Sequence, residues 1–487
     1  MRGWGWWALV LLAAFGLRVA FALHKGLVLD EFHTLHHASA DSLSGLMGGL
    51  LRDNHPPLTF LIVRLFLKTL GSGELFLRLP AILASVSELL LLVLIVRRHR
   101  NLNPIAPVLL VALSTAHLDY STQIRMYAMH ALAVTAATFG LLEVYRGATV
   151  RARRVGCAVL ALAVGFGLHN HYFFAHYLIG AGLFVGGWVI FRRTGWTRLV
   201  PAIGAAVLGA LAFVPWLLTG FRTQLSHQLA PGGDDVGLLA LIESFVHLFF
   251  LNISFGGEAG SIAFGVVGLV TALLACLGTW QLVRRGDGFT AGLLLTTGFL
   301  VPIYTNLLAT YYPRSGYTWS YVLPSTAAVG LLVGAACGTG LAERGERWAR
   351  RACGLSVAAA LLLCGLQFRH PGTEDYPGAI QQILEGYRPG DGVISAEMQP
   401  SLFPAGMPWD YYAPRLSEQP PPRLAVEGLS LVDPTALRGL GRLWILSSKL
   451  QFESPLRQQI GAAGYRRSQA WNHGYGRDVV LFESNGE

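Results

Sequence analysis

The sequence predicts a polytopic α-helical membrane protein that carries a small α/β domain in its C-terminal part. Of the 487 residues, 53% are hydrophobic and only 13% are charged, whereas soluble globular domains average about 25% charged residues. Apolar runs of bilayer-spanning length, about 20 residues each, recur as far as position 368. Beyond His370 the composition shifts to proline, glycine and charged residues. We therefore expect a membrane module over residues 1–368 and a separate α/β domain over 369–487.

We predict about eleven membrane spans from the apolar runs. They lie at 4–23, 78–96, 104–118, 128–145, 155–168, 172–191, 199–218, 260–283, 289–309, 318–340 and 352–368. The run at 56–70 is shorter, about 15 residues, and carries Arg64 and Lys68, so we expect an interfacial or re-entrant helix there. A second amphipathic stretch, 236–252, is predicted to lie at the interface as well.

The basic residues predict the orientation. With these spans, every basic cluster between them falls on one side of the membrane, which the positive-inside rule makes the cytoplasmic side. The clusters are 97–100, 146–154, 192–198, 284–285 and 344–351. An additional span at 56–70 would turn them all outward. We therefore expect a cytoplasmic N-terminus and an extracytoplasmic C-terminus.

The net charge of +9 is mostly this topological signal and implies no nucleic-acid partner. All five cysteines fall within predicted spans, so we expect neither a disulfide framework nor a cysteine-based zinc site.

The first outer loop, 24–77, holds the adjacent carboxylates Asp30 and Glu31. Neighbouring negative charges repel, so such a pair indicates a site where a cation, a proton or a substrate relieves the repulsion. The alternative is that Asp30 only caps a short helix over 34–40. Further along the same loop, His55 precedes a proline pair that opens the amphipathic stretch, which is equally compatible with a plain turn.

The next outer turn, 118–127, places Arg125 and Tyr127 at the membrane boundary. Arginines there often only snorkel and tyrosines often only anchor the interface, and Asp119 is a simple partner for Arg125. After the fifth span comes a polar group with His169, His171 and Tyr172. Two histidines in such a turn are able to ligate one metal ion, although this is the less favoured reading.

The second large outer segment, 220–258, begins after Trp216 and contains Gln224 and His227. The last outer loop places Arg314 at the mouth of the tenth span. In the C-terminal part, 392–396, 443–446 and 479–482 read as strands, and 379–387 and 456–465 as helices. No nucleotide-binding glycine loop and no internal repeat of the transporter type is present.

Several motifs in this order resemble one family. They are Asp30-Glu31, His55-Pro-Pro-Leu58, Arg78-Leu-Pro80, Gln123-Ile-Arg-Met-Tyr127, His171-Tyr172 and the Arg314 loop followed by Leu323-Pro324. Together they resemble the C-type glycosyltransferases, and among them glycosyltransferase family 39, which includes protein O-mannosyltransferases and lipid A aminoarabinose transferases. The resemblance covers about residues 1–340.

The resemblance implies a membrane enzyme that uses a polyprenyl-phosphate sugar as donor, inverts the anomeric centre and needs no metal or other cofactor. It implies that Asp30 is the catalytic carboxylate with Glu31 beside it. Donor or substrate contacts are then expected from Arg125, Tyr127, Arg314, His55, His171 and Tyr172. The small outer domain favours a bacterial, undecaprenyl-dependent enzyme of the plasma membrane. We expect this domain to shape access of a lipid, glycan or protein acceptor, while the membrane module performs the chemistry.

One departure from the family pattern leaves the acceptor chemistry open: after Glu31 the chain continues with Phe32 and His33, and His36 and His37 follow. A transporter or lipid flippase is the main alternative. Such a protein would carry its charges near the centres of the spans and show repeat symmetry, whereas the charges here gather at the outer ends.

Overall fold

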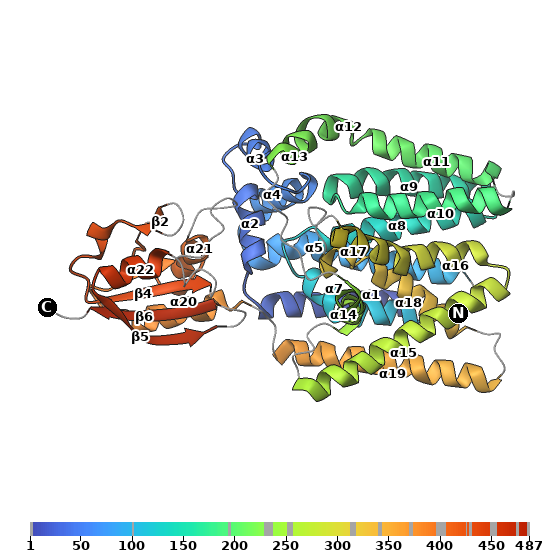
Figure 1. Cartoon of the computed structure of the whole chain (residues 1–487). Coiled ribbons are helices and arrows are strands. Elements are labelled where there is room, and N and C mark those ends of the chain that lie inside the picture. Colours follow the sequence, from blue (N-terminus) through green and yellow to red (C-terminus); the bar gives the residue numbers. More distant parts are fainter. Residues whose placement is uncertain are drawn as a thin grey trace. The chain divides into compact units, whose positions relative to one another are not determined.

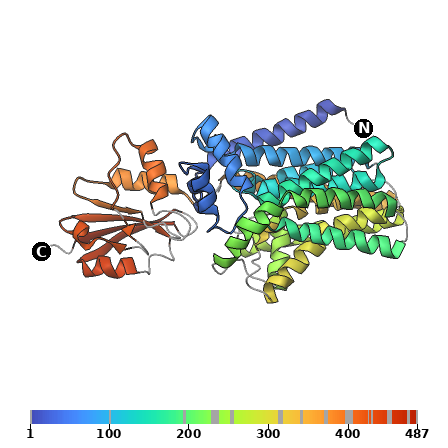
Figure 2. The same cartoon turned by 90° about the horizontal axis from the view of Figure 1, so that it is seen from above.

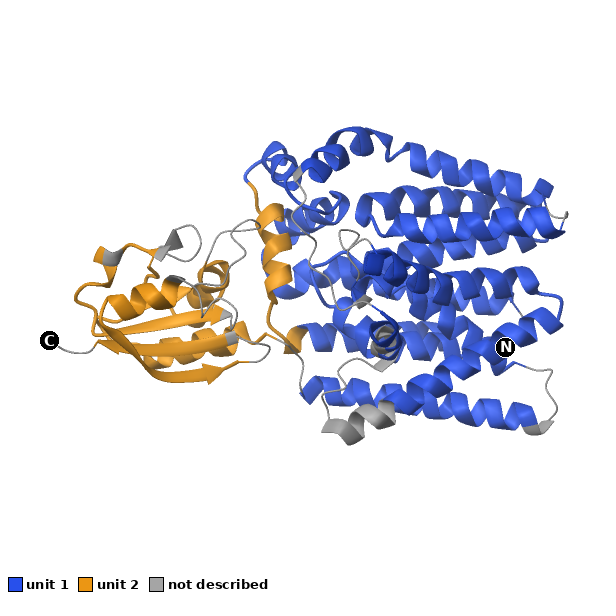
Figure 3. Cartoon of the chain, viewed as in Figure 1, with its two compact units in different colours: residues 1–22, 41–370 blue, residues 23–40, 371–487 orange. Residues whose placement is uncertain are grey.

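The computed structural model describes residues 3–99, 102–192, 196–227, 237–250, 257–311, 318–338, 343–369, 374–395, 406–424, 426–427, 431–448, 455–473 and 477–484. The chain divides into two compact units, each described here by itself (Figure 3). Unit 1 comprises Met1–Ala22 and Asp41–His370, and unit 2 comprises Leu23–Ala40 and Pro371–Glu487.

Unit 1 is a bundle whose long helices run side by side (Figures 1 and 2). Within the described residues, eight helices are long and apolar enough to cross a membrane. They are α1 (Trp4–His24), α5 (Glu74–Arg98), α8 (Tyr127–Arg146), α9 (Val150–Asn170), α10 (Phe174–Arg192), most of α15 (Gly257–Arg284), the continuous stretch α16–η2–α17 (Gly288–Tyr311) and most of α19 (Glu343–Arg369). The bent pair Trp196–Leu211 (α11) and Val214–Ser226 gives a ninth if it forms one span. The multi-pass membrane class predicted from the sequence is confirmed.

The predicted count of eleven is not confirmed, because two expected spans contain only short helices. The run 104–118 is broken into α6 (Ala106–Leu113) and α7 (Thr115–Tyr120). At the break, Ser114 accepts a hydrogen bond from the His117 N–H at 3.1 Å and so starts a new helix. In the run 318–340, α18 (Ser325–Ala336) begins after Pro324 and has 12 residues.

The other elements of unit 1 are short. They are α3 (Leu43–Leu50), α4 (Leu58–Leu70), α12 (Val214–Trp216), η1 (Leu217–Phe221), α13 (Arg222–His227), α14 (Leu238–Phe250) and η4 (Trp319–Val322). The stretch predicted at 56–70 is α4, whose 13 residues end at Gly71 with φ 90°. The stretch predicted at 236–252 contains α14, also with 13 residues. Both are shorter than a span, which agrees with the prediction that neither crosses the membrane.

Small residues let the helices approach closely. A Cβ on Gly156 of α9 would lie 2.8 Å from the Gly140 carbonyl oxygen of α8, and a Cβ on Gly278 of α15 would lie 1.8 Å from the Leu332 carbonyl oxygen of α18. Such contacts between backbones are typical of helix pairs in membranes, where apolar burial alone does not drive association.

Unit 2 contains a four-stranded sheet in the order β1-β4-β6-β5. Its strands are β1 (Gly392–Ser395), β4 (Arg442–Ser448), β5 (Tyr465–Asn472) and β6 (Arg477–Ser484). The β1–β4 pair is parallel, and β6 runs antiparallel to both β4 and β5. The helices are α2 (Leu29–Ala38), α20 (Tyr376–Gly386), α21 (Met407–Leu416) and α22 (Pro455–Ala462), with a small pair β2 (Val426–Glu427) and β3 (Leu431–Val432) and the turn η5 (Pro434–Leu437).

The α/β class predicted for the C-terminal part is confirmed, as are its three predicted strands. The predicted helix 456–465 ends earlier, at Ala462, because Gly464 adopts φ 85° and turns the chain. Strand β5, which follows, was not predicted. Its residues are nearly all exposed, so no apolar run marks it.

Candidate active site

Aromatic and imidazole side chains gather around His171 in unit 1. The His171 ring stacks on His130 with 5.0 Å between ring centres, and Tyr321 lies 4.7 Å away. His55 and Tyr127 each lie 6.2 Å from it. We call these five residues the His171 cluster. They come from the loop before α4, from α8, from the α9–α10 turn and from η4, so four separate segments meet at one point.

Asn170, the last residue of α9, fixes the turn that carries His171. Its amide donates to the Met126 carbonyl at 3.0 Å, and its side-chain oxygen accepts from the Thr59 hydroxyl at 2.7 Å. Asn170 is fully buried. These two bonds tie the end of α9 to α4 and to the start of α8, which holds His171 against its neighbours.

The cluster is buried except for Tyr321, which is partly exposed, and a fixed positive charge lies beside it. Burial lowers the pKa of His171 well below its ordinary value, and the neighbouring His130, His55 and Arg125 lower it further. His171 is therefore neutral near pH 7. Arg125 is buried, and its guanidinium lies 5.8 Å from the centre of the Tyr127 ring. His55 Nδ1 lies 2.9 Å from Asp53 Oδ1.

Tyr172 occupies a chain of hydrogen bonds next to the cluster. Trp216 Nε1 donates to its hydroxyl at 2.8 Å, and the hydroxyl donates to Gln224. The Gln224 amide in turn donates to the carbonyls of Leu50 and His55 at 2.7 and 2.9 Å. Burial raises the pKa of Tyr172, so it stays protonated and links α12 and α13 to the loop that carries His55.

Asp30 and Glu31 lie in the first turn of α2, in unit 2. The helix begins at Leu29, so the alternative that Asp30 caps a helix over 34–40 is wrong. Glu31 is fully buried and its Oε2 accepts from the Val28 N–H at 2.9 Å, whereas Asp30 is exposed. Carboxylates in the first turn are favoured by the helix dipole. Of the pair, Asp30 is the carboxylate that faces solvent.

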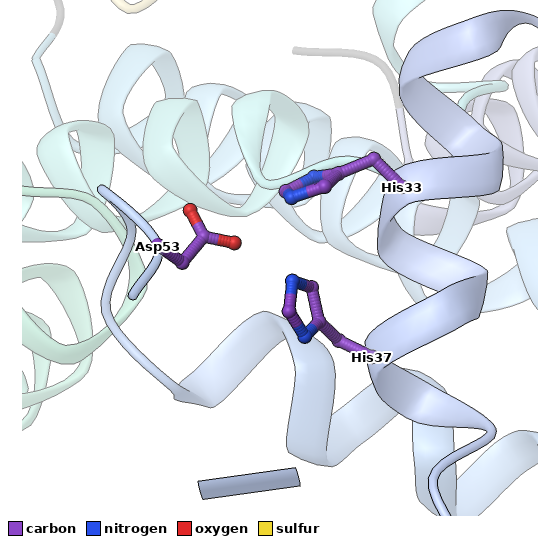
Figure 4. A group of neighbouring side chains, drawn as sticks. All are labelled: His33, His37 and Asp53. Atoms are coloured by element: carbon purple, nitrogen blue, oxygen red, sulfur yellow. The ribbon is translucent and has the colours of Figure 1, made fainter. Parts of the chain in front are cut away.

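His33 and His37 project from one face of α2, one turn apart (Figure 4). Their ring centres are 4.9 Å apart and the planes are nearly perpendicular, at 88°. Asp53, which Figure 4 also labels, belongs to unit 1. Two imidazoles four residues apart offer two ligands for a metal ion, so the metal independence expected from the sequence stays a prediction. Chelation of the purified protein followed by an activity assay tests it.

The sequence suggested His169 and His171 as two possible ligands of one metal ion. In the structure the two side chains have different neighbours. His169 Nδ1 lies 2.8 Å from the Gly165 carbonyl oxygen, and its ring packs against Phe213 at 5.1 Å. Arg314 lies outside the described residues. The other predicted residues of the membrane module, His55, Arg125, Tyr127, His171 and Tyr172, lie in or beside the His171 cluster.

His130 and Tyr321 were not singled out from the sequence. His130 follows Tyr127 by three residues, and a helix places such positions on the same face, so this spacing was the available signal. Tyr321 stands three residues before Pro324, in a segment that reads as part of an apolar run.

A cavity of about 510 Å³ lies away from this cluster. It is lined by Arg98, His99, Glu143, Arg146, Gly147, Ala148, Thr149 and Ala152. These residues surround the N-terminal end of α9, and His171 follows its C-terminal end. Since a helix rises about 1.5 Å per residue, the 21 residues of α9 separate the two places by the length of a span.

Residues 54–218 match the family model of the dolichyl-phosphate-mannose-protein mannosyltransferases. This range contains His55, Arg125, Tyr127, His171 and Tyr172, but not Asp30 or Glu31. Among curated protein sequences, none matches the chain.

The whole chain is similar in fold to several solved structures. The crystal structure of ArnT from Cupriavidus metallidurans bound to undecaprenyl phosphate matches with a TM-score of 0.52 and 13% identity, over 99% of this chain and 98% of that one. The apo structure of the same protein gives a TM-score of 0.51 at 13% identity, covering 98% of both chains. The arabinofuranosyltransferase AftD from Mycobacteria gives 0.50 at 14% identity, over 98% of this chain and 40% of that one.

The motifs, the match over residues 54–218 and the similarity of fold agree with one another. The resemblance predicted from the sequence is confirmed: this chain has the fold of the C-type glycosyltransferases.

Proposed function

We propose that this chain is a glycosyltransferase of the bacterial plasma membrane that moves a sugar from undecaprenyl phosphate to an acceptor on the outer face. The main support is the fold shared along its whole length with ArnT, whose structure holds undecaprenyl phosphate. A polyprenyl donor keeps its lipid in the bilayer and presents its sugar phosphate at the boundary. The predicted residues His55, Arg125, Tyr127 and His171 are all expected at that boundary.

Asp30 is the proposed general base. In a single displacement with inversion, the acceptor oxygen or nitrogen forms a bond to the sugar C1 while the bond from C1 to the phosphate oxygen breaks. The acceptor proton passes to the Asp30 carboxylate, and undecaprenyl phosphate leaves with the electron pair. A positioned carboxylate contributes about 10² to 10⁴-fold to such a step. The exposure of Asp30 supports this role, since the neighbouring Glu31 is buried and bonded to the Val28 main chain.

Arg125 is the proposed stabiliser of the leaving phosphate. A guanidinium offers a planar pair of donors that matches phosphate oxygens, and a cation in a buried setting stabilises developing negative charge better than water does. Arg125 is 4% exposed. His55, Tyr127, His171 and Tyr172 are proposed to line the donor site around it, and Arg314 is proposed as the second phosphate contact.

The proposal is tested by incubating the purified protein with labelled lipid-linked sugars and measuring the undecaprenyl phosphate released. Asp30→Asn is expected to lower turnover by about 10² to 10⁴-fold and to leave donor binding intact. Arg125→Ala and Arg125→Lys are both expected to weaken donor binding. Asp41→Asn, an exposed carboxylate outside the proposed site, serves as the matched control. Transport of a lipid-linked sugar without release of undecaprenyl phosphate would indicate the transporter or flippase alternative instead.

The sugar and the acceptor are identified by a second experiment. A strain that lacks the gene is expected to accumulate the lipid-linked donor and to lose one glycan or lipid modification. Mass spectrometry of its envelope would name both.

A further inference from the structure

The segment that carries Asp30 is built into the C-terminal domain. Leu23–Ala40 forms one compact unit with Pro371–Glu487 (Figure 3), although more than 300 positions separate the two segments in the sequence. The contacts concentrate on the first half of α2 and on the residues just before it.

Two side chains of the C-terminal domain hold the main chain where α2 begins. The Leu27 N–H donates to the Tyr412 hydroxyl at 2.6 Å, and the Leu29 N–H donates to Glu374 Oε2 at 2.5 Å. Leu29 is the first residue of α2, so its N–H has no partner within the helix. Glu374 therefore caps α2 from a distant part of the chain, and its negative charge lies at the positive end of the helix dipole.

Phe32 anchors the next turn of the helix. It is fully buried among three aromatic rings, those of Tyr376, Tyr411 and Tyr412, with ring centres 5.6, 5.8 and 6.1 Å away. All three rings meet it edge-on, at 87°, 77° and 81°, which is a favoured geometry for aromatic pairs. Phe32 lies two residues from Asp30.

Gly26 brings the two chain segments into direct contact. A Cβ at this position would lie 2.6 Å from Cδ of Pro377 and 3.2 Å from the Tyr412 hydroxyl. The chain thus lies against α20 and α21 directly before Leu27, and any larger residue would push α2 away from the domain.

We infer that Glu374, Phe32 and Tyr412 are positioning residues that set the place and direction of the Asp30 carboxylate. This inference rests on the proposed role of Asp30. It gives the C-terminal domain a part in the chemical step, beyond the access to the acceptor that was expected from the sequence. Loosening these contacts should lower the rate of the chemical step without weakening donor binding.

Hydrogen exchange of the full-length protein tests whether the domain holds α2. Tyr412→Phe removes the partner of the Leu27 N–H just before α2, and Glu374→Leu removes the partner of the Leu29 N–H at its first residue. Phe32→Leu reduces the aromatic packing. Loss of one hydrogen bond is worth about 2 to 12-fold in an opening equilibrium, so exchange in peptides covering 24–40 should rise by that factor. Glu374→Gln keeps an acceptor oxygen and should restore near wild-type exchange.

Tyr465→Phe is the matched control within the same unit. The Tyr465 hydroxyl donates to the carbonyls of Leu437 and Leu440 at 2.7 and 2.8 Å in the core of the sheet. Its removal deletes the same chemical group away from α2, and should leave exchange in peptides 24–40 as in the wild type.

Turnover assays on the same variants test whether positioning matters for the reaction. We expect kcat to fall about tenfold, equivalent to a barrier increase of 1.4 kcal/mol, in Tyr412→Phe and Glu374→Leu, with the donor KM within about twofold of the wild type. Glu374→Gln should recover kcat. Unchanged exchange in 24–40, or raised exchange with unchanged kcat while Asp30→Asn is inactive, would overturn the inference. If Asp30→Asn is fully active, the proposed function fails, and exchange alone decides whether the domain holds α2.

Discussion

Glu88 of α5 and His117 of α7 face each other inside the bundle, with 3.6 Å between the carboxylate Oε2 and the imidazole Nδ1. Both are fully buried. Glu88 Oε1 accepts from the Thr135 hydroxyl at 2.9 Å, and His117 Nε2 lies 2.6 Å from the Thr326 hydroxyl. Ionisable groups at membrane depth are costly unless they find partners, so this group ties α5, α7, α8 and α18 together.

Glu88→Leu is expected to destabilise the protein strongly. It leaves the buried Thr135 hydroxyl without its acceptor and the His117 imidazole, whose pKa burial lowers to about 3, without the polar group beside it. Each buried polar group left in this way costs about 1–3 kcal/mol. Glu88→Gln keeps an acceptor for the Thr135 hydroxyl and should cost about 1–2 kcal/mol. Thermal unfolding of both variants in the same detergent measures the difference. If both variants melted at the temperature of the wild type, the Glu88 carboxyl would contribute no stability.

Asn170→Ala is expected to lower both stability and turnover. It leaves the buried Thr59 hydroxyl without its acceptor, at about 1–3 kcal/mol. It also removes the bond from Asn170 to the Met126 carbonyl, which keeps only its bond from the His130 N–H, and so releases the turn that carries His171. Thr59→Val removes only one of the two bonds and leaves the link from α9 to α8 intact. It should therefore cost less stability and preserve turnover. A larger loss of turnover in Thr59→Val than in Asn170→Ala would contradict the role given to the Met126 contact.

Acid is expected to destabilise the protein through His171. An unfolded histidine binds a proton near pH 6.5, whereas burial holds the pKa of folded His171 well below that value. Below about pH 6.5 the unfolded state therefore binds more protons, and the free energy of unfolding falls as the pH falls. His171→Gln should make this dependence less steep between pH 5 and 7.5, and His117, whose pKa burial also lowers, should keep its own share of it. Phe173→Leu, in the same turn, removes packing without removing a titrating group and should keep the wild-type slope.

Much of unit 1 was predictable because hydropathy and charge act locally. Each long span is an apolar run with basic residues at one end, and the predicted site residues Arg125, Tyr127 and His171 stand at or beside the opposite ends of such runs. The length of a helix inside a run was harder to predict. Ser114 caps α7 in the middle of an apolar stretch, and only the three-dimensional structure shows that α6 and α18 are too short to cross by themselves.

The position of α2 had no signal in the sequence. Its contact with the C-terminal domain joins Leu29 to Glu374, 345 positions away, and no periodic pattern reports such a pairing. Phe32 reads as an ordinary apolar residue beside two carboxylates. His130 was not predicted either, because it lies inside an apolar span. From the sequence alone, a single polar residue in such a span does not show whether it has a functional role or only packs against its neighbours.

The close approach of α15 to α18 gives a prediction with a matched control in another helix. Gly278→Ala places a methyl group where the Leu332 carbonyl oxygen stands, at 1.8 Å. Because backbone oxygen cannot move aside without separating the two helices, we expect a loss of at least the 1–3 kcal/mol typical of overpacking. Gly182 of α10 has nothing within 4 Å of its Cβ position. Gly182→Ala should therefore be neutral or stabilising by about 0.5–1 kcal/mol, since alanine has the higher helix propensity. The two variants carry the same chemical change, so opposite shifts in melting temperature in one detergent would isolate the packing between α15 and α18. Shifts of the same sign and size would show that these helices do not meet at Gly278.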